Sequence, residues 1–288
     1  MAPPARSLAS TASASSVPRG VALASLRARQ WAHFVVLPLA ALRSSEMAAP
    51  TLDVALRAAR GLALASFALA FAYGLNAISD RATDLDRRKN PLAGRACPAS
   101  VTAVVVSTAG AALALGATAH RATLAAVAIS LASSTVYSVG PRLKMIPGVG
   151  TLLNVGIFAP LLFVAIGEHP PASLTSLAIA FVALLLQNQL LHERADATED
   201  EAARALTTAR ALGPTATTAI VFALGVGGVV ACAVSSPSAS LGWTAAGTFA
   251  LATTCTFARG PWTRRRAIHR WVSFVAGAAL FVVASVRQ

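Results

Sequence analysis

Long apolar segments recur along almost the whole chain, and they constrain its fold more than any other feature. A helix needs about 20 mostly apolar residues to cross the hydrocarbon core of a bilayer. Because backbone polar groups find no water there, each such segment is expected to be helical. We therefore predict an all-α membrane protein, a bundle of about nine transmembrane helices. The predicted segments are roughly residues 30–45, 58–76, 100–118, 122–139, 149–167, 172–191, 215–234, 239–257 and 269–286.

The composition agrees with a membrane protein and argues against nucleic acid as a partner. Hydrophobic residues make up 56% of the chain and charged residues only 12%, whereas soluble domains are about one quarter charged. The net charge of +13 could indicate nucleic-acid binding, but aromatic residues that could stack on bases are only 6% of the chain. The isolated positions of Cys97, Cys232 and Cys255 do not suggest a disulfide framework or a metal cage.

The N-terminal region differs from the rest of the chain. It is rich in Ala, Ser and Pro, and no acid occurs before Glu46. We predict a flexible basic tail over residues 1–28 and one polytopic transmembrane domain over residues 29–288. An organellar transit peptide has a similar composition and remains the alternative.

The distribution of Lys and Arg predicts the orientation in the membrane. With a cytoplasmic N-terminus, the tail and the links after the second, fourth, sixth and eighth predicted helices are cytoplasmic. Of the 24 cations, all but Arg43, Arg57, Arg60, Arg121 and Arg287 then lie on that side, as the positive-inside rule requires. The expected location is a bacterial plasma membrane, with an organellar membrane as the alternative.

Two of these links also carry most of the acidic residues. Asp80, Asp84 and Asp86 follow the second predicted helix, and five of the other acids follow the sixth. Four predicted helices separate the two links, so both links must face the same side of the membrane. Asn76, Asp80 and Asp84 have the spacing i, i+4, i+8, which places them on one face of a helix. His192, Asp196 and Asp200 repeat that spacing.

If the two helix ends face each other, four carboxylates and an amide converge on a central cavity of the bundle. Such a cluster is unfavourable until a hard cation lies among the oxygen atoms, and proteins hold Mg²⁺ with a few carboxylates together with substrate phosphates. The pattern therefore indicates a diphosphate bridged to the protein by Mg²⁺. The alternative is that the acids are surface charges paired with neighbouring arginines.

Cationic residues on the same side could neutralise a departing diphosphate. Arg142 and Lys144 follow the fourth predicted helix, and positive charge there would stabilise a transition state in which a bond to diphosphate breaks. Tyr137 could hydrogen-bond a phosphate or shield a carbocation, and Arg81 and Arg194 are further phosphate-binding candidates. The alternative is that Arg142 and Lys144 only set the topology.

Three ordered motifs resemble those of the UbiA superfamily of intramembrane prenyltransferases. "NAISDRATDLDRRKNPLAGR" resembles its first aspartate motif, and "YSVGPRLK" resembles its tyrosine–lysine signature. "DATEDEAARALTTARALG" resembles the second motif, through Asp196, Asp200, Thr207, Leu212 and Gly213. The resemblance covers residues 31 to about 215, and the predicted helix count extends it over the whole chain.

The resemblance implies transfer of a polyprenyl group from its diphosphate to an acceptor, often aromatic, with Mg²⁺ as cofactor. Lys144, with Arg142, would neutralise the leaving diphosphate, and the lipid tail would lie in a groove among the helices. The implied metal and diphosphate ligands are Asn76, Asp80, Asp84, Asp196 and Asp200.

The chain departs from the family pattern in places, and other functions stay open. Ala77 stands where the family commonly has a second acid, His192 replaces an Asp or Asn, and the stretch from Asp84 to Pro91 is about one residue short. "LRARQWAHFVVLPLA" resembles the branch that transfers phosphoribose to polyprenyl phosphate. A terpene cyclase of the same fold and a membrane transporter are the remaining alternatives.

Overall fold

The computed structural model describes residues 20–45, 51–84, 86–140, 142–166, 172–202, 205–235, 246–247, 249–254, 257 and 260–286. Most of the tail predicted over residues 1–28 lies outside these ranges, and its last part begins helix α1 (Val21–Ser25). Helix α2 (Ala28–Trp31), the 3₁₀ helix η1 (Ala32–Val36) and α3 (Leu37–Ser45) follow. The first predicted span, 30–45, is therefore a broken helix, whose α3 part holds Pro38 in its first turn, where proline is tolerated.

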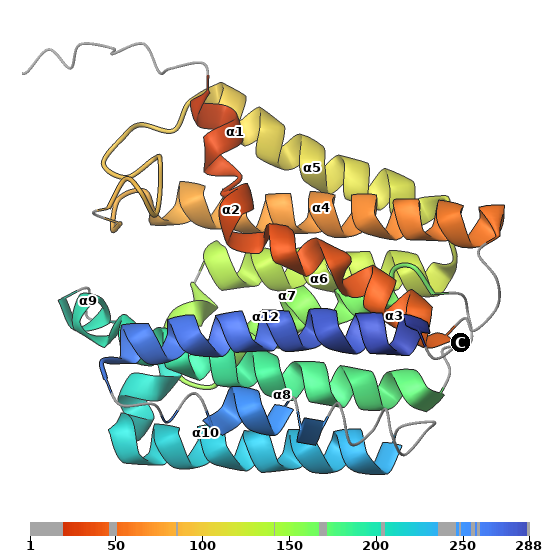
Figure 1. The fold of residues 1–288 in the computed structure, drawn as a ribbon. Coiled ribbons are helices and arrows are strands. Elements are labelled where there is room, and N and C mark those ends of the chain that lie inside the picture. The colour runs from red at the N-terminus through yellow and green to blue at the C-terminus, as the bar shows by residue number, and fades with distance from the viewer. Residues whose placement is uncertain are drawn as a thin grey trace, which may run out of the picture.

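The long helices lie side by side and run along a common direction (Figure 1). No strand occurs among the described residues. The remaining elements, in chain order, are α4 (Leu52–Asp80), α5 (Ala99–Ala117), α6 (Arg121–Ser138), η2 (Leu143–Met145), α7 (Val149–Phe158), η3 (Ala159–Phe163), α8 (Ala172–Ala195), α9 (Ala197–Ala202), α10 (Thr208–Ser235) and α12 (Trp262–Val286). Residues 246–247 and 249–254 are also helical.

Three helices in the described part of the chain are long and apolar enough to cross a membrane: Leu52–Asp80, Ala99–Ala117 and Thr208–Ala233. The all-helical prediction is confirmed, but the described residues do not confirm a count of about nine spans. The predicted span 149–167 is a shorter apolar helix, α7, that continues as 3₁₀ helix η3 with Pro160 near its start. Most of the predicted span 239–257 lies outside the described residues.

Small residues let the helices around α4 pack closely. Ala65 and Ala68 are fully buried, and they belong to a core that also takes in Leu64 on the same helix, Val127 from α6 and Leu161 from η3. Without hydrophobic driving force between helices in lipid, such close backbone approach supplies much of the packing energy. Large apolar side chains on the outside of the helices, such as Val106 and Phe222, are well exposed, as expected for surfaces that contact acyl chains.

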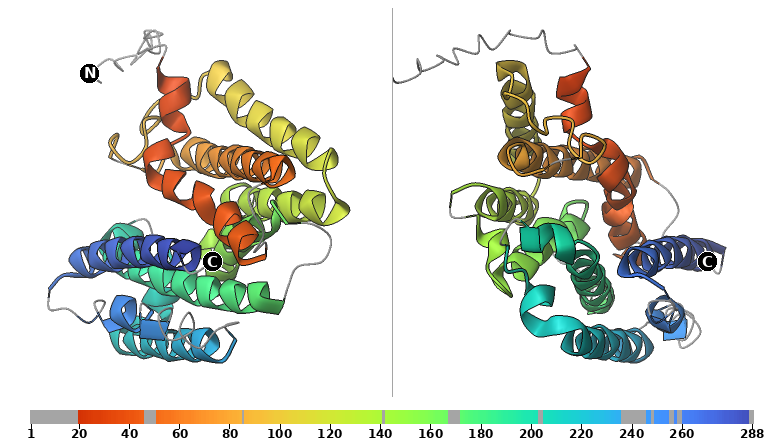
Figure 2. Two further views of the ribbon diagram at one scale, coloured as in Figure 1. Left: turned by 45° about the vertical axis from the view of Figure 1, so that its right-hand side comes forward. Right: turned by 90° about the vertical axis from the view of Figure 1, so that its left-hand side faces the viewer.

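A second group of helices is built on α8, which packs against α10 and α12 (Figure 2). Buried polar side chains join these helices. The Gln187 amide donates to the Val221 carbonyl at 2.7 Å and to the Thr253 hydroxyl at 3.1 Å, and its oxygen lies 3.1 Å from Nε2 of His269. Interhelical hydrogen bonds of this kind hold membrane helices in a defined register.

Packing at Gly61 generates a prediction about stability. A Cβ atom at Gly61 would lie 2.7 Å from Cβ of Ala165 and 2.9 Å from Cβ of Pro38, whereas one at Gly110 would meet no atom within 4 Å. We expect Gly61→Ala to destabilise the protein by about 1–3 kcal/mol through overpacking. Gly110→Ala, the matched control on α5, should leave the stability unchanged or raise it by about 0.5–1 kcal/mol. Unfolding with sodium dodecyl sulfate in mixed micelles measures both, and equal effects would contradict the packing described here.

Candidate active site

The links that carry the sequence motifs all lie at one end of the bundle, on the left in Figure 1. At this end α4 ends at Asp80, whose carboxylate is buried. The Lys144 ammonium donates to both Asp80 carboxylate oxygens, at 2.6 and 2.5 Å, and to Oδ1 of Asn76 at 3.1 Å. The first aspartate motif and the tyrosine–lysine signature therefore meet at one point.

Two further residues of the tyrosine–lysine signature complete this cluster. Arg142 donates to Oδ1 of Asp80 at 2.5 Å, and the Lys144 ammonium lies 5.7 Å from the centre of the Tyr137 ring. Burial lowers the pKa of Lys144, and the charge of Asp80 opposes part of that shift. The cluster holds two cations against one carboxylate, so a further anion beside it would be stabilised.

An unusual backbone conformation brings Lys144 to Asp80. Arg142 adopts the left-handed conformation, with a φ of 49°, just before η2, and Gly148 has a φ of 77° just before α7. A Cβ atom at Gly150 would lie 2.6 Å from the carbonyl oxygen of Lys144. Glycine at position 150 therefore permits the close approach of α7 to η2. A left-handed backbone conformation at a residue other than glycine, as at Arg142, is strained, and such strain is common at functional sites.

Asp84 does not continue α4, which corrects the expectation of a single helical face through Asn76, Asp80 and Asp84. The helix ends at Asp80, and Asp84 lies in the link beyond it, where the backbone N–H groups of Thr83 and Asp84 both donate to the Asp80 carbonyl, at 3.0 and 2.8 Å. The amide of the buried Asn90 donates to the Asp84 carboxylate at 2.8 Å and to the Ala77 carbonyl at 3.0 Å. Asn90, which the sequence analysis did not select, thus fixes Asp84 against the end of α4.

The second aspartate motif keeps its helical spacing although α8 ends at Ala195. Backbone hydrogen bonds from Asp196 to His192 and from Asp200 to Asp196 carry the helical pattern into α9. Burial acts to raise the pKa of Asp196, but the His192 imidazole, 3.0 Å away, and neighbouring cations outweigh it and lower the pKa. Burial raises the pKa of Asp200, and the charge of Asp196 adds to that shift. The two carboxylates therefore differ in how readily they ionise.

Lys89 joins the two acidic links across the end of the bundle. It lies between Asp84 and α5, and its ammonium donates to both carboxylate oxygens of Glu199 on α9, at 3.0 and 2.9 Å. The same ammonium lies 3.9 Å from the Asp196 carboxylate. Partial burial acts to lower the pKa of Lys89, but the hydrogen bond to Glu199 and the negative charges of Asp196 and Glu199 outweigh it and raise the pKa. The expectation that both acidic links face the same end of the molecule is confirmed by this contact.

Glu193 is a buried residue that positions the site and that the sequence analysis did not select. Its carboxylate accepts hydrogen bonds from the Ala209 backbone N–H at 2.8 Å, the Gln189 amide at 3.0 Å and the Thr151 hydroxyl at 3.2 Å. These partners lie on α10, α8 and α7. Glu193 therefore connects the second motif to α7, which begins four residues after η2 ends.

Arg81 and Arg194, two of the predicted phosphate-binding residues, are engaged away from the Lys144 cluster. Arg81 caps α4 by donating to the Ile78 carbonyl at 2.6 Å, and the Arg194 guanidinium lies 5.5 Å from the centre of the Trp262 ring on α12. Ala77 is fully buried in an apolar cluster with Leu92 and other residues. A second acid at position 77 would lie in this apolar cluster, which gives a physical reason for alanine there.

The carboxylates fit a cation that shares its ligands with a substrate better than one held by protein alone. Among the described residues, no group of three or more His, Cys, Asp or Glu side chains is arranged to hold a metal ion. Mg²⁺, however, is usually bound through one or two carboxylates plus substrate phosphates and waters. Asp80 and Asp84 on one side and Asp196 and Asp200 on the other supply donors of that kind.

The comparison with family models decides the family. The model of the UbiA prenyltransferase family matches residues 32–284. The chain belongs to the UbiA prenyltransferase family. Since this family is embedded in membranes, the long apolar helices are those of a membrane protein. None of the curated proteins compared with this UbiA family member matches it.

Solved structures of other proteins share the fold. A UbiA homologue from Archaeoglobus fulgidus bound to DMAPP and Mg²⁺ has a TM-score of 0.69 at 18% identity, over 91% of this chain and 99% of the homologue. The same homologue bound to GPP and Mg²⁺ has a TM-score of 0.69 at 19% identity, over 92% and 99%. A structure described for digeranylgeranylglyceryl phosphate synthase has a TM-score of 0.70 at 12% identity, over 93% and 98%. At these identities the likeness establishes the fold.

The network around Glu193 generates a second prediction. In Glu193→Gln, an acceptor oxygen becomes an amide group that faces hydrogen-bond donors, so at least one buried donor loses its partner. We expect a loss of about 1–3 kcal/mol in stability. Glu201→Gln, at an exposed position on α9, is the control and should change stability by less than about 0.5 kcal/mol. The same detergent unfolding assay measures both, and a wild-type stability for Glu193→Gln would show that the network does not hold α7, α8 and α10 together.

Proposed function

We propose that this protein transfers a polyprenyl group from its diphosphate to an acceptor, with Mg²⁺. The observation that carries the proposal is the meeting of Asp80, Asn76, Lys144 and Arg142 at the end of α4. Membership of the UbiA family supports it, as do the prenyl diphosphates and Mg²⁺ bound by the A. fulgidus homologue of the same fold.

In this proposal the carboxylates hold Mg²⁺ against the donor's diphosphate, and Lys144 and Arg142, which lie beside Asp80, bind the same diphosphate directly. Asn76, Asp80 and Asp84 would hold Mg²⁺ on one side, and Asp196 and Asp200 would hold it on the other. When bound, Mg²⁺ would neutralise charge on the phosphate oxygens and so make diphosphate a better leaving group. Lys144 and Arg142, which now bind Asp80, have N–H donors that would reach the same phosphate oxygens.

The proposed reaction begins with cleavage of the allylic C–O bond. The bonding electrons leave with the diphosphate, where Lys144 and Arg142 stabilise the charge that develops, as fixed cations do best in a water-poor site. The allylic carbocation is then attacked by an electron-rich atom of the acceptor, a new bond to carbon forms, and the acceptor loses a proton. The Tyr137 ring, beside Lys144, could shield the carbocation from water.

The proposed acceptor is an aromatic molecule, and the prenyl chain would lie in a lipid-facing groove among the helices. The proposed location is a bacterial plasma membrane, with the motif links on the cytoplasmic side, where the water-soluble diphosphate is released. The excess of Lys and Arg in these links supports that orientation.

Phosphoribosyl transfer to polyprenyl phosphate is the nearest alternative, because it also needs a metal-bound diphosphate leaving group. Purified protein incubated in parallel with radiolabelled geranylgeranyl diphosphate and radiolabelled phosphoribosyl diphosphate separates the two reactions. We expect Mg²⁺-dependent release of diphosphate from the prenyl donor only. Consumption of the phosphoribosyl donor alone would refute prenyl transfer, and uptake into vesicles without turnover of either donor would indicate a transporter.

Removal of the charge from a motif aspartate should abolish turnover. We expect Asp80→Asn and Asp196→Asn each to lower the rate of diphosphate release by at least about 100-fold, because each removes an anionic ligand for Mg²⁺. Asp86→Asn is the matched control, since Asp86 lies in the same link and is exposed, and it should keep a rate within about twofold of wild type. The rates are measured with radiolabelled prenyl diphosphate at saturating Mg²⁺. Near-normal turnover in both motif variants would refute the metal-site assignment.

The role of Lys144 can be separated from that of the metal ligands. Lys144→Gln keeps a hydrogen-bond donor but removes the charge, so we expect kcat to fall by about 10²–10³, as for loss of one preorganised transition-state contact. The concentration of Mg²⁺ that gives half-maximal rate should not rise for Lys144→Gln, because Lys144 competes with the metal for the Asp80 oxygens, whereas it should rise sharply for Asp84→Asn. A Lys144→Gln enzyme with normal kcat would exclude this residue from stabilising the leaving group.

A further inference from the structure

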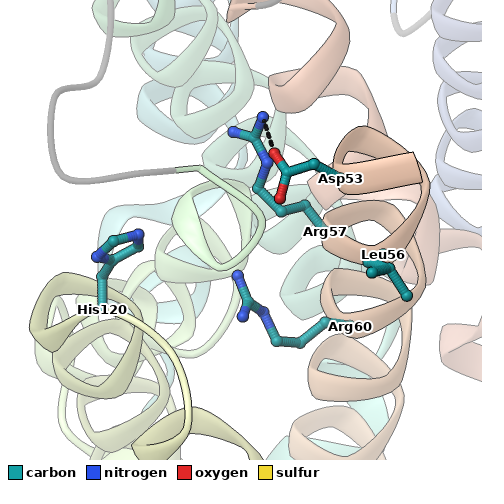
Figure 3. A pocket seen from close by; sticks show the side chains of 5 residues that line it. All are labelled: Asp53, Leu56, Arg57, Arg60 and His120. Carbon is teal, nitrogen blue, oxygen red and sulfur yellow. Dashed lines mark ion pairs between the residues drawn. The ribbon is translucent and has the colours of Figure 1, made fainter. Parts of the chain in front are cut away.

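A cavity of about 410 Å³ lies at the opposite end of α4 from the proposed active site. It is lined by Asp53, Leu56, Arg57, Arg60 and His120 (Figure 3). Arg57 precedes Asp80 by 23 positions on one helix, which separates them by about 35 Å at 1.5 Å per residue. The cavity is therefore distinct from the site at the motif links and lies near the other surface of the membrane.

The side chains that line the cavity favour an anion. Arg57 and Arg60 extend from the same face of α4, and His120 faces them from the start of α6, as Figure 3 shows. The Asp53 carboxylate, 2.8 Å from the Arg57 guanidinium, balances one of the two cations. Within the described residues, Nε of Arg60 is buried and has no hydrogen-bond partner. One arginine thus has its charge unbalanced by the lining residues.

The surface of α4 beside the cavity is apolar, so an acyl chain could lie along it. Leu56, which lines the cavity, is 60% exposed, and Leu52, one turn earlier, is 77% exposed. A ligand in the cavity would therefore place an anionic group on the arginines and an apolar group along α4. An inorganic anion would use only the first of these two features.

Topology alone does not account for these cations. Arg57, Arg60 and Arg121 are three of the five cations that the sequence places away from the cation-rich side of the membrane. Cations on this side oppose the positive-inside bias, so another interaction is needed to explain two arginines that converge on one cavity.

We propose that this cavity binds the phosphate group of an anionic phospholipid headgroup, with the acyl chains lying along Leu52 and Leu56. Arginine binds phosphate oxygens through paired N–H donors, which gives it a geometric preference for this group. Basic cavities between transmembrane helices recognise anionic headgroups in this way. The proposal does not depend on the prenyltransferase reaction.

The test uses the full-length protein in detergent micelles and native mass spectrometry to count retained lipids. Dioleoyl phosphatidylglycerol is the anionic probe and dioleoyl phosphatidylcholine the zwitterionic one. We expect phosphatidylglycerol to bind about tenfold more tightly, and Arg57→Gln/Arg60→Gln to remove that preference, since one charge-assisted contact is enough for a factor of this size. Arg121→Gln, at an exposed position on the same end of the bundle, is the matched control and should keep the preference.

A further variant and a competitor make the test specific. Asp53→Asn removes the negative charge that lines the cavity and its ion pair with Arg57, and it should tighten phosphatidylglycerol binding several-fold, a gain that misfolding cannot produce. Inorganic phosphate at equal concentration should not displace the lipid. The proposal is overturned if the double variant keeps the preference, if Asp53→Asn weakens binding, or if inorganic phosphate displaces the lipid and so identifies a site for the free anion.

Discussion

The buried contact between Lys144 and Asp80 is the interaction on which the rest of the site depends. Both side chains are largely shielded from water, and neither charge would be stable there without the other, because an unpaired buried charge costs several kcal/mol. The contact joins a link between helices to the end of the long helix α4. It thereby sets where positive charge meets the carboxylate that we propose as a metal ligand.

Two layers of contacts with different strengths surround this pair. The inner layer is buried: Glu193 connects α7, α8 and α10, and Asn90 fixes Asp84 to the end of α4. The outer layer is the pairing of Lys89 with Glu199, whose side chains are 48% and 71% exposed. Exposed ion pairs contribute only about 0–1 kcal/mol, so the inner layer can keep its geometry while the outer contact opens and closes at little cost.

From the sequence, it was easier to predict that the motifs meet at one end of the bundle than to predict the local conformation of each motif. Even numbers of helices between the links placed Asp80, Lys144 and Asp196 at one end, and this follows from connectivity alone. The expectation of one helix through Asp84 was wrong, because α4 ends at Asp80 and Asp84 lies in the link, where the Asn90 amide binds its carboxylate. Glu193 and Asn90 were missed because their importance comes from burial and from partners on other elements, which no spacing rule reports.

The sequence by itself determined that this chain is helical and membrane-embedded, and it indicated which polar residues are candidates for the site. Long apolar segments form helices in lipid because the backbone must satisfy its own hydrogen bonds there, and ionisable residues at membrane depth are candidates for function. The tertiary structure decided which partners those residues bind. The left-handed turn at Arg142 and the close approach at Gly150 bring Lys144 to Asp80, and the stacking on Trp262 draws Arg194 away. The partners of these residues depend on how elements that are distant in sequence pack together, and a local sequence pattern contains no information about that packing.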